Sequence, residues 1–219
     1  MVKIERTFPA PASLEAEAKK LSGKYDKPDV VKQLREDAHD KCYICEMKGL
    51  QDRVVEHLLP HKDGKYSDRK FDWNNLFWAC GHCNSVKNQQ KYDEGVIDCC
   101  KKDPEEFISF RLINEEIDVH ANNPDNKEAV LTATLVNEVF SLKNTGMRVY
   151  KSNMRFQELN KEMNKLYDNL EELKQKPDSK VVLRKLRALL RRESSFAAFK
   201  RNYIKDNKDR YPHLIEYII

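Results

Sequence analysis

No stretch of this sequence approaches the ~20 consecutive apolar residues that a helix needs to cross a bilayer. Its first six residues, MVKIER, lack the apolar core of a secretion signal. It also contains no internal repeat and no low-complexity tract. Of its 219 residues, 40% are hydrophobic and 35% are charged, which is too apolar for a disordered chain. We therefore expect a soluble, cytoplasmic protein without membrane contacts, built as one domain or as a small domain with a helical extension.

The net charge of +4 is small, but the charges are unevenly distributed. Residues 1–125 hold 20 Lys and Arg against 24 Asp and Glu, a net of −4, whereas residues 126–219 hold 20 against 12, a net of +8. The C-terminal part is therefore the better candidate for a surface that binds a polyanion. An ordinary solvated helical surface is the alternative.

The six cysteines are arranged in a way that favours a metal over disulfides. A reducing cytoplasm disfavours disulfides, and four cysteines form two Cys-x-x-Cys knuckles, Cys42/Cys45 and Cys80/Cys83. Four thiolates are a set that Zn²⁺ prefers, and they would fill its tetrahedral coordination, so the sequence predicts a structural zinc. Free buried thiols are the alternative. The adjacent Cys99-Cys100 pair has no matching pair, and we expect core or surface thiols there.

The pattern outside the knuckles is mainly helical. Residues 1–12 should be extended, and the NNPDN stretch at 122–126 is the clearest break in the chain. The periodicity and the end signals predict helices over Ser13–Leu21, Asp29–Asp40 and Glu128–Leu142, and a β-hairpin over Ile108–Ile113 and Ile117–Ala121.

Two longer helices are expected near the C-terminus. After Gly146, apolar residues recur at spacings of 3 and 4 from Phe156 to Leu173, and Pro177 ends this helix. The next helix carries Leu183, Leu186, Leu190 and Ala197 on one stripe, so the pair predicts an antiparallel hairpin. A second stripe on that helix is basic and is a candidate for sequence-independent phosphate contacts; its members are Lys180, Arg184, Arg187 and Arg191.

The segment between the knuckles carries most of the polar chemistry. Val54 and Val55 favour a strand, which leads into Glu56-His57-Leu58-Leu59-Pro60-His61. The chain returns through KFDWNNLFWA to the second knuckle, and Asn84-Ser85-Val86-Lys87 follows at the start of a predicted helix. Zinc would therefore hold strand, loop and helix start together, where Glu56, His57, Asn75 and Asn84 can converge.

These pieces together resemble the HNH endonuclease family, over about residues 41–91. The resemblance implies a ββα-metal module in which His57 is the general base, Glu56 and Asn84 bind a catalytic cation, and Asn75 orients the histidine. A carboxylate and an amide oxygen suit Mg²⁺ or Mn²⁺. Glu replaces the more usual Asp, and the third motif residue is Asn instead of His. His61 and Lys87 are candidates for assisting the site.

A closer resemblance extends over most of the chain. The segments KIERTFPAP, CYIC, EHLLPH, KFDWNNLFWACGHCN and NTGMR are similar to the family of HNH subunits called PtuB, found in Septu-type and retron-associated bacterial anti-phage systems. This resemblance implies a partner ATPase of the ABC/SMC type, similar to PtuA. In retron versions it also implies a reverse transcriptase and its RNA–DNA product.

The sequence therefore predicts an α+β, mostly α-helical protein with a zinc-clamped HNH module. We expect an N-terminal arm and helices at 1–40, the nuclease module at 41–125 and a helical scaffold at 126–219. The expected function is metal-dependent hydrolysis of phosphodiester bonds in DNA or RNA. The alternative is a protein without catalysis, which binds nucleic acid through its zinc module or docks an ATPase through its helical hairpin.

Overall fold

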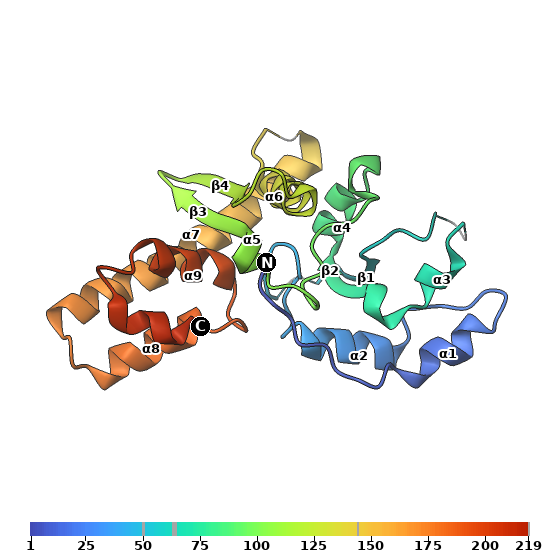
Figure 1. Ribbon diagram of the computed structural model, residues 1–219, viewed down its shortest axis with the longest axis horizontal. Coiled ribbons are helices and arrows are strands. Elements are labelled where there is room, and N and C mark those ends of the chain that lie inside the picture. The colour runs from blue at the N-terminus through green and yellow to red at the C-terminus, as the bar shows by residue number, and fades with distance from the viewer. Residues whose placement is uncertain (50, 63–64, 144, 219) are drawn as a thin grey trace.

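The computed structural model describes residues 1–49, 51–62, 65–143 and 145–218. The fold is α+β, with about half of the chain in helices and two antiparallel two-stranded sheets (Figure 1). The α-helices are α1 (Ala12–Ala18), α2 (Pro28–Asp37), α3 (Ser67–Lys70), α4 (Gly81–Lys87), α5 (Pro104–Phe107), α6 (Lys127–Phe140), α7 (Gly146–Gln175), α8 (Lys180–Leu190) and α9 (Ala197–Asp206). The strands are β1 (Arg53–His57), β2 (Leu76–Cys80), β3 (Ile108–Ile113) and β4 (Glu116–Ala121). Short 3-10 helices are η2 (Trp73–Asn75), η3 (Gln90–Tyr92) and η4 (Pro212–Tyr217).

Helix α2 shows how the N-terminal helices attach to the first sheet. Pro28 occupies its first turn, where the missing N–H is not needed for a hydrogen bond within the helix. Val30 and Leu34 are buried one turn apart and belong to one apolar cluster with Trp78 of β2. The sequence placed α2 correctly, although it ends three residues earlier than expected, at Asp37.

The first sheet consists of β1 and β2, whose register pairs Glu56 with Phe77 and His57 with Leu76. Strand β2 is buried along its whole length. Its alternate residues enter different apolar clusters, since Leu76 and Trp78 pack with α2, whereas Phe77 packs in the main core. Because side chains alternate across a strand, Glu56 faces the main core and His57 faces the α2 side.

Helix α4 follows β2 without a loop. The Cys80 side chain caps it by accepting a hydrogen bond from the Cys83 N–H at 3.5 Å. The helix begins at Gly81, three residues before the expected start at Asn84. Strand, strand and helix thus follow in the order β1, β2, α4, with the second knuckle at the junction of strand and helix.

The second sheet is the expected hairpin, in which β3 has the predicted bounds. Asn114 and Glu115 form its turn with positive φ angles of 48° and 62°. The hairpin packs against α6 through β4 and against α9 through β3. It therefore contacts the helical part of the chain directly.

Helices α7 and α8 form the predicted antiparallel hairpin. Leu166, Leu170 and Leu173 of α7 are buried in one core with Val182 and Leu186 of α8. The Ser179 hydroxyl caps α8 by accepting from the Val182 N–H at 3.4 Å.

The prediction of one continuous last helix through Ala197 was wrong. Helix α8 ends at Leu190, and α9 begins only at Ala197, after Phe196 adopts a left-handed conformation with φ 50°. The break lets α9 fold back onto α8 and α7, so its aromatic residues complete the core instead of extending the hairpin.

The elements are arranged in two lobes that meet near the N-terminus (Figure 1). One lobe contains α1–α4 and the β1–β2 sheet, and the other contains α8, α9 and the C-terminal half of α7. Within the described ranges, no helix combines the length and apolarity required to cross a membrane.

Candidate metal centre and active-site cleft

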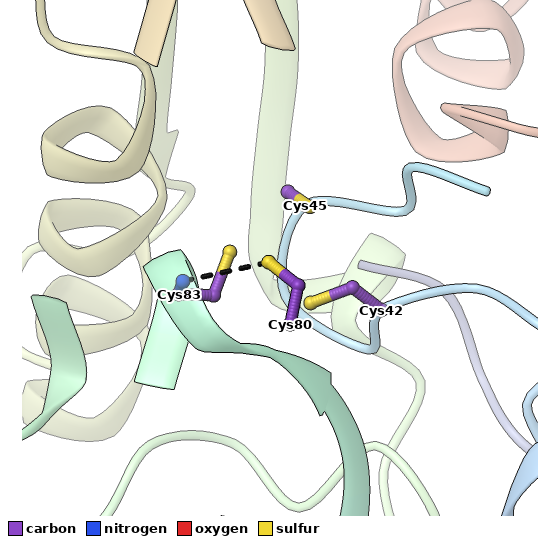
Figure 2. Close-up of side chains that lie close together, drawn as sticks. All are labelled: Cys42, Cys45, Cys80 and Cys83. Atoms are coloured by element: carbon purple, nitrogen blue, oxygen red, sulfur yellow. Dashed lines mark hydrogen bonds between the residues drawn. The ribbon is translucent and has the colours of Figure 1, made fainter. Parts of the chain in front are cut away.

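The four knuckle cysteines converge on one buried point. The Sγ atoms of Cys42, Cys45, Cys80 and Cys83 all lie within 4.8 Å of one another. Figure 2 shows two of them on the loop before β1 and two at the junction of β2 and α4. Four sulfurs at this spacing match the tetrahedral set that zinc prefers. The grouping predicted from the sequence is therefore confirmed as a candidate zinc site.

A cation from the N-terminal half of α7 contacts this sulfur cluster. Arg155 of α7 is 2% exposed and donates a hydrogen bond from Nη2 to the Cys80 Sγ at 2.9 Å. The neighbouring thiols, Cys42 first among them, lower the pKa of Cys80 well below its usual value, and Arg155 lowers it further. Burial raises the pKa of Cys42 and Cys83. Arg155 therefore favours the thiolate form that binds a metal.

Each knuckle is also fastened to the helical scaffold. His82 is buried and not at the surface, and its Nε2 donates to the Val139 carbonyl of α6 at 2.9 Å. Glu46, directly after the first knuckle, accepts hydrogen bonds from the Ala197 and Ala198 N–H groups at the start of α9, at 2.9 and 3.2 Å. The metal centre thus lies where the two lobes join.

An open cleft of about 650 Å³ lies at the end of β1. It is lined by Glu56 and His57 of β1, Asn84 and Lys87 of α4, His61 of the following loop and Tyr25 of the α1–α2 loop. Five of these six residues were predicted from the sequence to belong to a site. Asn75 is buried beneath the loop and does not line the cleft.

His57 is held in one orientation by the main chain. Its Nε2 lies 3.0 Å from the Lys70 carbonyl oxygen. A carbonyl only accepts, so Nε2 carries the proton and Nδ1 is left as the acceptor nitrogen. The pKa of His57 is lowered to about 4, mainly because the ring is buried. The hydrogen bond to the Lys70 carbonyl acts in the opposite direction and raises the pKa, but its effect is smaller. The ring is therefore neutral near pH 7 and can accept a proton.

The Asn75 side chain forms hydrogen bonds with the main chain on both sides of the His57 region. Its Nδ2 donates to the carbonyls of Leu59 and Arg69 at 2.9 and 3.0 Å, and its Oδ1 accepts from the Leu59 N–H at 2.8 Å. Leu59 lies two residues after His57, and Arg69 precedes the Lys70 carbonyl that holds the ring. The amide therefore joins the two segments that fix the imidazole.

Each carboxylate oxygen of Glu56 accepts one hydrogen bond from another side chain. Its Oε1 accepts from the Lys87 Nζ at 2.6 Å and its Oε2 from the Tyr43 hydroxyl at 2.6 Å. Burial raises the pKa of Glu56, and the Lys87 ammonium and the Tyr43 hydroxyl act in the opposite direction. Asn84 and Lys87 lie three residues apart on α4 and so share a helix face beside this carboxylate.

Tyr25 and His61 form an aromatic cluster with the His57 ring. The Tyr25 and His61 ring centroids lie 4.5 and 4.8 Å from that of His57, both edge to face. The His61 Nδ1 is buried and has no hydrogen-bond partner in the described part of the chain. Tyr25 thus covers one side of the His57 ring.

The basic stripe on α8 lies away from the cleft, in the other lobe (Figure 1). Lys180, Arg184 and Arg187 are exposed along the helix. Arg191 is also exposed, but it follows the end of α8 in an extended conformation, with ψ 146°. The stripe therefore has three helical members and one beyond the helix.

Sequence reasoning missed three residues of this region: Tyr25, Tyr43 and Arg155. Tyr25 and Arg155 lie far from the motif in the sequence, and no local pattern marks them. Tyr43 lies inside the first knuckle. Nothing in the sequence indicated that it contacts Glu56. No protein-family model matches this chain, and no curated protein does either.

Proposed function

We propose that this protein is a metal-dependent HNH-type endonuclease that hydrolyses phosphodiester bonds in nucleic acid at the β1–α4 cleft. The observation that carries the proposal is the His57 ring. It lines an open polar cleft, its Nε2–H is fixed by the Lys70 carbonyl, and its Nδ1 is left to accept a proton. A neutral imidazole with one fixed nitrogen is the group that a general base requires.

In the proposed reaction, Nδ1 of His57 removes a proton from water as the water oxygen bonds to phosphorus. One P–O ester bond breaks, and the departing oxygen takes a proton from solvent. Tyr25 and the Lys70 carbonyl keep the imidazole in place during this step. Asn75 holds the segments on either side of it.

The cleft also offers a place for the catalytic Mg²⁺ or Mn²⁺ expected from the resemblance. The Glu56 carboxylate already holds a positive charge, the Lys87 ammonium, and Asn84 adds an amide from the same side of α4. Oxygen donors of these two kinds suit a hard divalent cation. When bound, such a cation would stabilise negative charge on the phosphate and on the departing oxygen.

We further propose that the protein is the nuclease effector of a bacterial anti-phage complex, together with an ABC/SMC-type ATPase and, in a retron system, a reverse transcriptase with its RNA–DNA product. The support is the resemblance of five separate segments to PtuB subunits. The substrate in such a complex would be DNA or RNA. The ATPase would control access to the cleft.

Cleavage by the purified zinc-loaded protein tests the catalytic proposal. Plasmid DNA and total RNA would be incubated with Mg²⁺, with and without the ATPase, and the ends sequenced. We expect His57→Ala to reduce the cleavage rate by about 10²–10⁴-fold, the usual contribution of a general base. His213→Ala, an exposed histidine in η4, is the matched control and should cleave normally. Undiminished cleavage by His57→Ala would refute the assignment.

The exposed cations of α8 favour a second candidate, a zinc-dependent nucleic-acid-binding protein without catalysis. This alternative predicts binding that weakens with salt and no divalent-ion-dependent nicking under any of these conditions. The same incubations therefore separate the two functions.

A further inference from the structure

The buried contact between Lys87 and Glu56 places a cation where the cleft offers its carboxylate. The Lys87 Nζ lies 2.6 Å from Glu56 Oε1 and 3.0 Å from the His57 carbonyl oxygen. The Glu56 and Lys87 residues are only 4% and 5% exposed. Lys87 is therefore the resident counter-ion of Glu56.

A divalent cation at Glu56 would compete with this ammonium. A carboxylate has about four lone-pair positions, and the side chains described by the structure use two of them, through Lys87 and Tyr43. Oxygen is thus available for a metal, but two cations at one carboxylate repel each other strongly where water is scarce. Binding of the divalent cation and the Lys87 contact therefore oppose each other.

A displaced Lys87 has one obvious destination. The other lysine lining the cleft, Lys62, is already paired with Asp93, which also lines it. A released Lys87 ammonium has a flexible four-carbon stem and lies beside open polar space, so an anion in the cleft would become its partner. In the proposed function that anion is the phosphodiester.

We propose that Lys87 is a displaceable counter-ion, which holds Glu56 until a divalent cation binds there and then turns into the cleft to contact the phosphate. The contact with phosphate rests on the proposed function, whereas the exchange at Glu56 does not. Lys87 is in this view a gate on cation binding as well as a substrate contact.

Mn²⁺ binding to the zinc-loaded full chain tests the exchange. We expect Lys87→Met to bind Mn²⁺ at least about tenfold more tightly than wild type by calorimetry, because the competing charge is gone. Lys87→Arg keeps a cation and should remain near the wild-type affinity. Lys91→Met, which removes a lysine paired with Glu138 nearby, is the control. Unchanged or weaker Mn²⁺ binding by Lys87→Met, or no Mn²⁺ binding by either protein, would overturn the proposal.

A second measurement uses only the wild-type protein, because Lys87→Met leaves a buried carboxylate unpaired and can fail to fold. Reductive methylation followed by mass spectrometry reports which lysines are accessible. Lys87 should be protected without Mn²⁺ and at least about tenfold more reactive at saturating Mn²⁺, whereas Lys102, paired with Glu128, should not change. Equal protection of Lys87 with and without Mn²⁺ would refute the exchange.

Neither readout involves nucleic acid, so this inference and the nuclease proposal can fail separately. Cleavage that depends on His57 while Lys87 stays protected would eliminate the exchange alone. An exchange without any cleavage would eliminate the nuclease alone. The phosphate contact predicts a KM for nucleic acid about tenfold higher in Lys87→Met at saturating Mn²⁺, and an unchanged KM would exclude it.

Discussion

Arg155 of α7 donates a hydrogen bond to the Sγ of Cys80 at 2.9 Å, which connects the long helix to the second cysteine knuckle. Four thiolates with one Zn²⁺ carry a net charge of about −2, so a buried guanidinium beside them offsets part of that charge. Helix α7 also forms a hairpin with α8. The helical scaffold therefore supplies a positive charge that stabilises the negatively charged zinc site.

Replacing Arg155 should lower the affinity of the cysteine cluster for Zn²⁺. We expect Arg155→Met to bind Zn²⁺ about 10–100-fold more weakly, the range seen when a group contacting a metal ligand is removed. Competition with a chromogenic chelator measures the change. Arg148→Met, an exposed arginine on the same helix, is the control. Equal zinc retention by Arg155→Met and wild type would show that the Arg155 contact does not influence the metal.

Removing zinc should unfold the β1–β2–α4 region. All four cysteines belong to the main apolar core, and structural zinc sites contribute on the order of 10–16 kcal/mol in zinc-finger peptides. We expect a strong chelator to lower the melting temperature and reduce helical circular dichroism, and added Zn²⁺ to restore both. One zinc per chain should be lost from Cys42→Ser but kept by Cys100→Ser. Full zinc content in Cys42→Ser would contradict the four-cysteine site.

Asn75→Ala should disturb the position of His57 and the stability of the fold. It removes three partly buried hydrogen bonds, which at about 1 kcal/mol each amounts to roughly 2–4 kcal/mol of unfolding free energy. Because Asn75 acts through Leu59 and Arg69, we expect kcat to fall while KM changes little. Chemical denaturation and steady-state kinetics measure the two effects. Asn74→Ala, an exposed neighbour, is the control.

Much of the fold could be predicted because local signals decide it. Pro28, Ser179 and the apolar spacing of α7 mark helix boundaries and faces, and the hairpin turn at Asn114-Glu115 separates two alternating strands. The end of α8 could not be predicted in this way. Its cause is tertiary, since the Glu46 carboxylate fixes the start of α9 from 151 residues away.

In the candidate site, too, some residues could be predicted from local sequence, whereas their contacts with distant residues could not. The cysteine spacing and the Glu56-His57 pair could be recognised because metal ligands and motif residues are close in sequence. Lys87 was a candidate from the sequence, but its contact with Glu56 was not predicted. The other partners of these groups come from elsewhere in the chain: Tyr43 for Glu56, the Lys70 carbonyl for His57, and Arg155 for Cys80. Contacts of this kind depend on the finished fold, so no local pattern shows them.

Substitutions of Tyr25 test whether its ring supports His57 in the proposed role of general base. Its ring packs edge to face on His57, a contact that Phe can keep and Ala cannot. We expect Tyr25→Phe to retain nearly the wild-type cleavage rate and Tyr25→Ala to lose about tenfold in kcat, since an aromatic pair contributes about 0.5–1.5 kcal/mol. A Phe variant as slow as the Ala variant would instead assign the role to the hydroxyl.

If the protein binds nucleic acid as proposed, the α8 stripe is the candidate surface for its phosphates. The stripe and the cleft lie in different lobes, so a bound nucleic acid that touches both must run along the molecule (Figure 1). Reversing Lys180, Arg184 and Arg187 to Glu should lower the slope of log affinity against log salt by about 2–3, near 0.9 for each phosphate that the variant no longer neutralises. The matched control replaces Lys161, Lys165 and Lys174 of α7 with Glu, which changes the net charge by the same amount. These three lysines are paired with Glu residues of their own helix. Equal slopes for the two triple variants would assign the stripe to a protein partner or to solvent, because charge alone would then account for any weakening of binding.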